Sequence, residues 1–343
     1  MRAGLITGKD TFELVELDEP TPSTEEVVLA IQRCGVCGSD VHAYVEGWRL
    51  APGICGHEWV GTVVAAGSDV TNVAEGDLVT GGQAPGCGQC RECRADLSQY
   101  CRVAKSHYSG RLAPASGGFA PYMALHAERV ISISHEIALD DAAMIEPAAV
   151  ALHAVRRSRL KFGDIAVVVG AGPIGLLTAQ CVRIAGAGLV IVVEPDADRR
   201  ALALATGAHI AVAPGEPMKE AIDAATAGLR ADIAFDCAGI PQTIQQSVDT
   251  VRTGGSVCIV GVTSQPATIS PMHWMMKEVA VDTSLVFTLD EMRIAAAMIG
   301  GGRLQVRPLH QGTVDLDGLA QTIDDLATRS STAVKVLVDP TAG

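Results

Sequence analysis

A glycine-rich turn in the middle of the chain restricts its possible folds more than any other feature. Residues 165–175 read IAVVVGAGPIG, an apolar run that reaches three glycines and then continues into a second apolar stretch. In such a pattern Gly170 allows a tight turn, Gly172 lets the backbone approach a pyrophosphate, and Gly175 lets a helix pack closely on a strand. The stretch therefore predicts a buried strand, a turn, and a helix whose free N–H groups face a dinucleotide.

An acidic residue after the next apolar run supports this cofactor role. Glu194 ends the run LVIVVE, where a carboxylate would hydrogen-bond the adenosine ribose and repel a 2′-phosphate, which favours NAD over NADP. Arg199 and Arg200 could in principle accept that phosphate. A glycine turn without a cofactor is disfavoured because strand, turn, helix and acid occur together. The residues expected to bind the cofactor are Gly170, Gly172, Pro173, Ile174, Gly175, Glu194, Arg199, Ala238, Val260, Val262 and Leu285.

Two kinds of pattern divide the chain into two parts. The first third contains short strand-like runs cut by turns, such as EEVVLAIQRCG and EGDLVTGG, and it has no sustained helical period until about residue 140. From Ile165 onward, apolar runs alternate with helical stretches, which predicts a parallel sheet wrapped by helices. A helix beginning at Glu291 and a final strand beginning at Lys335 are expected to rejoin the first part.

The composition supports a packed α/β enzyme. Of the 343 residues, 48% are hydrophobic and 19% are charged, and 36 are glycines. This balance suits two Ala-, Val- and Gly-rich domains and excludes a disordered chain. The formal net charge of −13 repels phosphate backbones and anionic lipids, so we expect neither nucleic acid nor a membrane as a partner.

The N-terminal stretch and the cysteines indicate a reducing compartment. The residues MRAGLITGKDTFELVEL contain no basic region leading into an apolar run and no small-residue cleavage site, so we expect a cytoplasmic protein without a secretory signal. Proteins in such a compartment keep their cysteines reduced. The ten cysteines are therefore expected to be thiols and metal ligands rather than disulfides.

Four cysteines lie close together in the stretch CGQCRECRADLSQYC. Their spacing is C-x2-C-x2-C-x7-C, so four thiolates can form a tetrahedron around one zinc ion. Such a site has no open position for a substrate, and its zinc is therefore expected to be structural. An iron–sulfur cluster is disfavoured because no second cysteine-rich segment accompanies it. The predicted ligands are Cys87, Cys90, Cys93 and Cys101.

Three further segments offer metal ligands that are weak signals when taken singly. In CGVCGSDVHAY, Cys34 and Cys37 resemble a redox pair but lie outside any βαβ pattern. In CGHEWVG, a lone pair such as His57 and Glu58 is more often a core or surface feature than a ligand set. Together with Glu146 in MIEPAAVALHA, these segments supply one thiolate, one imidazole and one or two carboxylates. That set leaves zinc an exchangeable position, as a catalytic zinc requires.

The order and spacing of CGVCGSDVH, GHEWVG, the four-cysteine lobe, IEPAAVALHA and GAGPIG resemble the zinc-dependent medium-chain alcohol dehydrogenase family over essentially the whole chain. The resemblance is closest to the branch of sorbitol, butanediol and threonine dehydrogenases. It implies a GroES-like β-rich catalytic domain of residues 1–147 and 288–343, with a structural zinc lobe at about 85–103. It also implies an inserted Rossmann domain of residues 148–287, and an active-site cleft between the domains.

By position, the resemblance assigns the ligands of a catalytic zinc. Cys37 and His57 would be ligands, and Glu146 would be the third ligand or would hold a zinc-bound water. Glu58 would be a nearby carboxylate that can exchange onto the metal during turnover. Asp40 would accept a hydrogen bond from the metal-bound imidazole and fix its tautomer.

The resemblance also implies a proton relay, a set of cofactors and a reaction. Ser39 would take the substrate proton and pass it through the nicotinamide ribose toward His42 and solvent, while Cys34 would be a core thiol. Each chain would bind one catalytic zinc, one structural zinc and NAD, and would transfer hydride from an alcohol to the nicotinamide. The family further implies a homotetramer, with a homodimer as the alternative.

The chain departs from the polyol dehydrogenases of this branch at two positions. A tyrosine that commonly follows the relay histidine is replaced by Ala43, and an arginine that holds sugar hydroxyls is replaced by Val286. Both changes remove polar groups, which favours a secondary alcohol or vicinal diol smaller or more apolar than sorbitol. Possible pocket walls are Tyr44, Trp48 and Phe119, for each of which simple packing is the alternative.

Three other functions stay open at the level of sequence. One is a threonine-type amino-alcohol dehydrogenase, although no basic pocket residue for a carboxylate is identifiable. Another is a non-enzymatic zinc-binding adaptor that uses the four-cysteine lobe on nucleic acid, which the net charge disfavours. The third is a zinc-less, quinone-reductase-like relative, which would lack the second ligand set.

Overall fold

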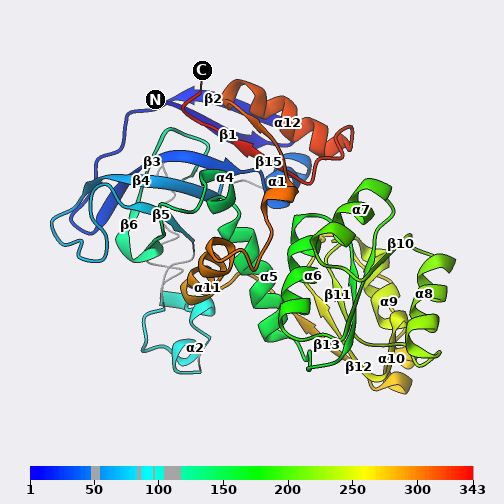
Figure 1. Cartoon of the computed structure of the whole chain (residues 1–343). Coiled ribbons are helices and arrows are strands. Elements are labelled where there is room, and N and C mark those ends of the chain that lie inside the picture. The colour runs from blue at the N-terminus through cyan, green and yellow to red at the C-terminus, as the bar shows by residue number, and fades with distance from the viewer. Residues whose placement is uncertain (48–54, 83–85, 96, 104–116, 343) are drawn as a thin grey trace. The chain divides into compact units, whose positions relative to one another are not determined.

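The structure, a computed structural model, describes residues 1–47, 55–82, 86–95, 97–103 and 117–342. The chain divides into two compact units, shown in Figure 1. Unit 1 comprises Met1–Glu146 and Phe287–Gly343, and unit 2 comprises Pro147–Val286. The domain limits expected from the sequence lie one residue later in the chain at both junctions.

Unit 2 is built on a six-stranded parallel sheet. The strands run in the order β10-β9-β8-β11-β12-β13, and every pairing between neighbours is parallel. This doubly wound order reverses direction between β8 and β11, the place where such sheets bind dinucleotides. The strands are β8 (Ile165–Val169), β9 (Leu189–Val193), β10 (Ile210–Val212), β11 (Ala231–Asp236), β12 (Val251–Ile259) and β13 (Ala280–Thr283).

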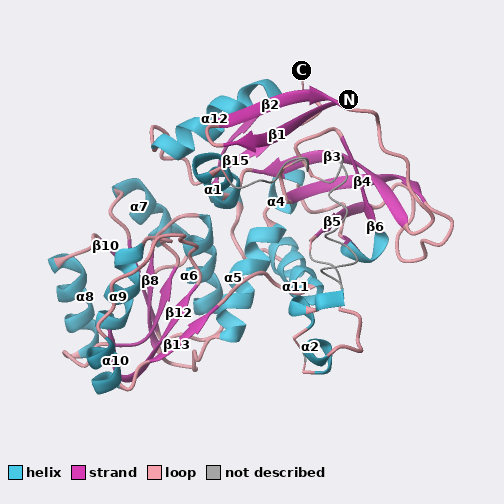
Figure 2. Ribbon diagram, turned by 180° about the vertical axis from the view of Figure 1, so that it is seen from behind, coloured by secondary structure: helices cyan, strands magenta, loops and turns pink. Residues whose placement is uncertain are grey.

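Helices connect these strands and pack on the sheet (Figure 2). Buried valines and isoleucines of β8, β9 and β11, including Val167, Ile191 and Ile233, fill the space beneath them, as the apolar runs predict for a sheet covered on both faces. The parallel sheet expected from the alternating pattern is confirmed. The helices are α5 (Ile145–Arg157), α6 (Pro173–Ile184), α7 (Ala197–Thr206), α8 (Glu216–Thr226), α9 (Pro241–Thr250) and α10 (Pro271–Lys277).

Unit 1 is β-rich and is formed by both ends of the chain. Its larger sheet has the order β14-β15-β3-β4-β5-β7, and β6 pairs with β3. Because β15 pairs with β3, the C-terminal strand rejoins the first part of the chain as expected, and the two termini lie close together in Figures 1 and 2. The strands of unit 1, of which β1 and β2 form a separate two-stranded sheet, are β1 (Arg2–Gly8), β2 (Thr11–Glu16), β3 (Glu26–Gly35), β4 (Glu58–Ala66), β5 (Leu78–Gly81), β6 (Tyr122–His126), β7 (Val130–Ser132), β14 (His310–Val314) and β15 (Lys335–Val338).

Two longer helices complete unit 1. α11 starts at a capping box in which Thr288 and Glu291 bond each other's backbone N–H groups, and α12 is capped by Asp315. Leu319 and Ile323 of α12 join the buried core formed by β1, β3 and β6. The helices of this unit are α1 (Gly38–Glu46), α2 (Arg91–Arg94), α4 (Leu139–Ala142), α11 (Leu289–Gly300) and α12 (Leu316–Thr328), with 3-10 turns at Ser98–Tyr100, Ala127–Arg129 and Arg307–Leu309.

The nine-residue helix α1 corrects the expectation of no sustained helix before about residue 140. Cys37 and Asp40 form its capping box, and Gly47 ends it in the left-handed conformation, with φ of 71°. Only Asp40 and Ala43 of the helix are buried. The helix therefore has no apolar stripe and depends on its caps, which is why apolar periodicity did not predict it.

Candidate zinc and dinucleotide sites

Antiparallel pairing brings three of the predicted metal ligands together in unit 1. Gly35 at the end of β3 pairs with Glu58 at the start of β4, so Cys37, which follows β3, lies beside His57 and Glu58. The ligand atoms of Cys37, His57 and Glu58 all lie within 4.8 Å of one another. A thiolate, an imidazole and a carboxylate at this separation fit zinc and leave a fourth position for an exchangeable group.

Asp40 is buried beneath this cluster and contacts two of its members. Its side chain is 2% exposed, its Oδ2 accepts the backbone N–H of Cys37 at 2.9 Å, and its Oδ1 lies 4.0 Å from Nδ1 of His57. Burial raises the pKa of Asp40, and the neighbouring His57 opposes that shift. The position suits a group that orients a metal-bound imidazole, as the sequence predicts.

His57 is held among anionic groups. Desolvation lowers the pKa of His57, but Cys37, Asp40 and Glu146 together raise it well above its ordinary value in the metal-free chain. A metal ligand must be a neutral imidazole, so metal binding here displaces a proton.

Glu146 lies near the cluster but outside the group of three. It is 8% exposed at the start of α5. Burial raises the pKa of Glu146 to about 7, with Glu58 acting in the same direction and His57 against it. Of the two carboxylates that the sequence left open as ligands, the geometry groups Glu58 with Cys37 and His57.

Lys335 belongs to this site and was not predicted from the sequence. Its Nζ donates to Glu58 Oε2 at 2.5 Å and to the carbonyl of Val36 at 3.0 Å, and its side chain is only 1% exposed. Burial lowers the pKa of Lys335, but Glu58 and Cys37 raise it above the ordinary value. The only local signal is a lysine at the head of the apolar strand KVLV, where a buried charge needs a partner.

The predicted relay residues lie on α1. Ser39 is exposed, and His42 follows it by three positions, which puts both on one side of the helix. Nδ1 of His42 lies 3.4 Å from Oε1 of Glu46. This contact ties the imidazole to the last residue of α1.

The four-cysteine lobe has the geometry of a closed metal site. The sulfur atoms of Cys87, Cys90, Cys93 and Cys101 lie within 4.8 Å of one another, and the Cys90 sulfur is 3.5 Å from that of Cys93 and 3.7 Å from that of Cys101. These distances suit the edges of a tetrahedron with zinc–sulfur bonds of about 2.3 Å and are too long for a disulfide. None of the ten cysteines forms a disulfide.

The glycine-rich turn of unit 2 meets the steric demands of a dinucleotide site. Gly170 has φ of 97°, Gly172 caps α6, and Pro173 is the first helical residue. A Cβ on Gly175 would lie 2.0 Å from the carbonyl oxygen of Gly170, so only glycine allows this approach of helix and turn. Gly172 has open space around the position of a Cβ, as a backbone surface that receives a pyrophosphate requires.

Glu194 reaches back to this turn. Its Oε2 accepts the N–H of Ala171 at 2.7 Å, and its Oε1 accepts the N–H of Asp196 at 3.0 Å. The Arg200 guanidinium donates to the carbonyls of Glu194 and Pro195, and is therefore occupied at the start of α7. The carboxylate is thus fixed at the end of β9, where it can meet a ribose.

The remaining cofactor candidates follow the ends of three neighbouring strands. Ala238 follows β11, Val260 and Val262 follow β12, and Leu285 follows β13. Val262 is 48% exposed and Leu285 is 59% exposed. The parallel pairing of these strands puts all four residues at the carboxyl edge of the sheet, where open α/β sheets bind ligands. Ile174 and Arg199 lie in the first turns of α6 and α7.

The structure does not support all of the proposed pocket walls. Phe119 is 0% exposed in the core of unit 1 and fills the space above Gly56, where a Cβ would lie 2.6 Å from its ring, so it has no surface with which to contact a substrate. Tyr44 packs against the same core and donates to Asp324 at 3.4 Å. Trp48 lies outside the described residues.

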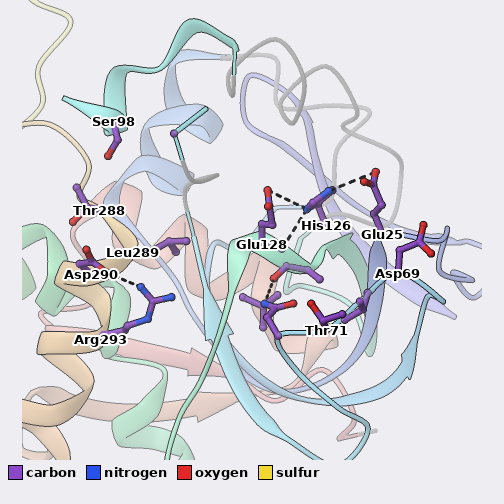
Figure 3. A pocket seen from close by; sticks show the side chains of 15 residues that line it. Glu25, Asp69, Thr71, Ser98, His126, Glu128, Thr288, Leu289, Asp290 and Arg293 are labelled. Atoms are coloured by element: carbon purple, nitrogen blue, oxygen red, sulfur yellow. Dashed lines mark hydrogen bonds and ion pairs between the residues drawn. The ribbon is translucent and has the colours of Figure 1, made fainter. Parts of the chain in front are cut away.

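A separate cavity of about 490 Å³ lies elsewhere in unit 1 (Figure 3). Its wall includes His126, whose Nδ1 accepts the backbone N–H of Glu128 at 3.2 Å, and Arg293, which is paired with Asp290. Its wall contains none of the predicted metal ligands or cofactor residues. Chemistry is therefore assigned to the metal cluster rather than to this cavity.

Comparisons with known proteins agree with these two sites. Residues 23–135 match the family model of the alcohol dehydrogenase GroES-like domain, and residues 173–300 match that of the zinc-binding dehydrogenases. The sorbitol dehydrogenase of Halalkalibacterium halodurans is 31% identical, over 97% of this chain and 97% of that protein. The L-threonine 3-dehydrogenase of Streptomyces coelicolor is 31% identical, over 96% of each.

Solved structures share the whole fold. A protein described as a zinc-binding dehydrogenase from Sinorhizobium meliloti 1021, solved with NADP, has a TM-score of 0.88 and 30% identity, with 99% of each chain covered. The 2R,3R-butanediol dehydrogenase of Bacillus subtilis has a TM-score of 0.86 and 28% identity, again with 99% of each chain covered. In the described part of the chain, no helix combines the length and the apolar character needed to cross a membrane.

Proposed function

Because the chain belongs to the zinc-dependent medium-chain alcohol dehydrogenase family, we propose that it oxidises a secondary alcohol, a vicinal diol or a polyol to the ketone, with NAD as the hydride acceptor. The observation that carries this proposal is the cluster of Cys37, His57 and Glu58, whose ligand atoms lie within 4.8 Å of one another and leave a coordination position open. The four-thiolate lobe offers no such position and is assigned a structural zinc.

The residues around the cluster are assigned different roles in the reaction. A zinc ion bound there would polarise the substrate hydroxyl, and the nicotinamide would accept the hydride. Asp40 keeps the His57 imidazole oriented toward the cluster. The exposed hydroxyl of Ser39 would take the substrate proton while releasing its own through the nicotinamide ribose toward His42 and solvent.

NAD is preferred over NADP because of Glu194. Its two carboxylate oxygens are held by the N–H groups of Ala171 and Asp196, so the negative charge is fixed where a 2′-phosphate would have to lie. The guanidinium of Arg200 is bonded to backbone carbonyls and would have to release them to bind that phosphate. The relative from Sinorhizobium was solved with NADP, and titration with each cofactor tests the preference of this chain.

A compact or apolar substrate is favoured over a long polyol. Ala43 is 0% exposed and offers no hydroxyl, and Val286 offers no charge for sugar hydroxyls. Relatives named for sorbitol, threonine and butanediol are about equally similar to this chain, so similarity alone does not choose among them. The cytoplasmic location expected from the sequence stays a prediction.

A homo-oligomer is proposed from one exposed face of unit 2. α10 carries Met272, Met275 and Met276, which are 71%, 68% and 68% exposed, while Trp274 packs inward against the core. The next strand, β13, is the last in the sheet order. An exposed apolar face beside an edge strand is typical of a subunit contact. Light scattering should give the molar mass of a dimer or tetramer. The double substitution Met275→Asp and Met276→Asp should lower that molar mass toward the value of a single chain.

A screen of NAD reduction tests the proposed activity. The chain, loaded with zinc, is assayed with 2,3-butanediol, simple secondary alcohols, sorbitol and threonine. We expect the highest kcat/KM for a small diol or secondary alcohol and a low value for sorbitol. A preference for threonine would instead identify an amino-alcohol dehydrogenase. Absence of turnover on all four classes, with two zinc ions bound, would contradict the proposal.

A further inference from the structure

The ion pair between Lys335 and Glu58 spans three strands of the unit 1 sheet. Lys335 begins β15 and Glu58 begins β4, and both strands flank β3. Neighbouring strands are roughly 5 Å apart, so the two side chains must reach across β3 to meet. They do so at 2.5 Å, with side-chain exposures of 1% and 2%.

Gly35, the last residue of β3, leaves room for this contact. A Cβ at Gly35 would lie 2.0 Å from Oε2 of Glu58 and 3.1 Å from its Cβ. Any other residue would therefore push the Glu58 carboxylate out of its path to Lys335. The backbone of Gly35 is not in the left-handed region, so the reason for glycine is the space that Glu58 occupies.

The charges around the pair explain why a buried lysine is present. Asp40, Glu58 and Glu146 are 2%, 2% and 8% exposed. His57 lies 4.0 Å from Asp40, whereas Glu58 pairs with Lys335. Buried anions of this kind are unfavourable without a compensating charge. The Lys335 ammonium group, which also donates to the Val36 carbonyl beside Cys37, is placed to supply that charge.

We propose that Lys335 is a positioning residue of the metal cluster: it fixes the Glu58 carboxylate beside Cys37 and His57 and balances the buried negative charge while no metal is bound. The bond from Lys335 Nζ to Oε2 restricts how the Glu58 carboxylate can turn. The inference rests on the proposed zinc site. It extends that site to Lys335, which lies 277 positions after Glu58 in the sequence.

This role predicts an unequal effect on the metal-free and zinc-bound proteins. Removing the ammonium group leaves the buried Glu58 carboxylate without its ion-pair partner, which is strongly destabilising. A bound zinc ion supplies positive charge to the same groups, so its presence compensates for much of the loss. A lysine that only filled space would contribute equally in both states.

The test compares Lys335→Met with the wild-type chain, each stripped of zinc and then reloaded. We expect the Tm of the stripped variant to fall by on the order of ten degrees, and the Tm of the reloaded variant to fall by less than half as much. Lys277→Met is the matched control, because Lys277 donates to the carbonyl of Val248 in unit 2. This control should lower the Tm by the same amount in the stripped and the reloaded protein. The four-cysteine zinc is common to all the chains and cancels in the comparison.

A second variant keeps the test decisive if Lys335→Met folds poorly. Adding Glu58→Gln removes the unpaired carboxylate, and the double variant should recover most of the stripped-state Tm. Equal Tm losses with and without zinc, or no recovery in the double variant, would overturn the positioning role. Zinc stoichiometry is measured in parallel. A wild-type chain that binds only one zinc would instead overturn the proposed catalytic site, so the two failures can be told apart.

Discussion

Oδ1 of Asp40 lies 4.0 Å from Nδ1 of His57, while the other oxygen of the same carboxylate accepts the backbone N–H of Cys37. One buried side chain therefore couples the imidazole ligand to the start of α1, the helix that also carries Ser39 and His42. The geometry links the cap of that helix to the orientation of the metal ligand.

Replacing Asp40 with Asn should weaken zinc binding at the catalytic cluster. The amide still accepts the Cys37 N–H, but it removes the charge that orients the His57 ring, and loss of such a partner typically lowers metal affinity 10- to 100-fold. Competition with a chelator measures the change. Asp317→Asn is a control, because Asp317 pairs with Arg2 at the surface. Unchanged affinity in Asp40→Asn would contradict the orienting role.

Replacing Cys101 with Ser should remove one zinc ion per chain without removing the other. Cys101 is a proposed ligand of the closed four-thiolate site, and a structural zinc contributes directly to folding. We expect one zinc by elemental analysis, a lower Tm, and alcohol oxidation retained by the folded fraction at low temperature. A variant that keeps its Tm and loses all turnover would place catalysis at this lobe instead.

Replacing Glu194 with Ala should weaken NAD binding and narrow the preference for NAD over NADP. The carboxylate accepts two backbone N–H groups, and hydrogen bonds to a charged group contribute about 1.5–3 kcal/mol, which corresponds to roughly 10- to 100-fold in affinity. Titration of protein fluorescence with each cofactor measures the change. If both affinities stay as in the wild type, Glu194 does not contact the ribose.

Asp232 should stabilise unit 2 in a pH-dependent way. Burial raises its pKa, but the N–H of Ile165 and the Arg252 guanidinium, each bonded at 2.8 Å, bring the pKa below the ordinary value. A carboxylate with a lowered pKa stabilises the fold above the unfolded-state pKa of about 3.9, and this contribution is lost as the pH falls through the folded-state pKa.

Asp232→Asn should therefore reduce the free energy of unfolding by about 1 kcal/mol at pH 7 and by less below pH 3. Urea titrations at the two pH values measure the difference. An equal loss of unfolding free energy at the two pH values would mean that the charge of Asp232 does not contribute to stability.

Local spacing made several features predictable from the sequence. The turn from Gly170 to Gly175 and the four-cysteine lobe each lie in one short segment, so their chemistry can be read without knowing the fold. The strands of unit 2 followed from apolar runs for the same reason. Cys37, His57 and Glu58 were weak signals singly, and their roles were assigned through the resemblance to a family, because β3 and β4 bring them together from separate segments.

Long-range contacts explain what the sequence did not reveal. Lys335 meets Glu58 only because β15 and β4 both flank β3, and a single lysine before an apolar strand does not name its partner. Helix α1 depends on its caps rather than on an apolar face. Phe119 was a candidate pocket wall because aromatic side chains serve both packing and binding, and only its complete burial decides between the two.

The most direct test of the central claim is alcohol oxidation by His57→Ala. His57 is a proposed ligand of the open cluster and lies in unit 1, whereas the glycine turn proposed to bind the dinucleotide lies in unit 2. We expect one zinc per chain in place of two, NAD binding within about twofold of the wild type, and a kcat at least roughly 1,000-fold lower, because polarisation of the substrate by the metal is lost. Turnover close to that of the wild type would contradict catalysis by zinc at Cys37, His57 and Glu58.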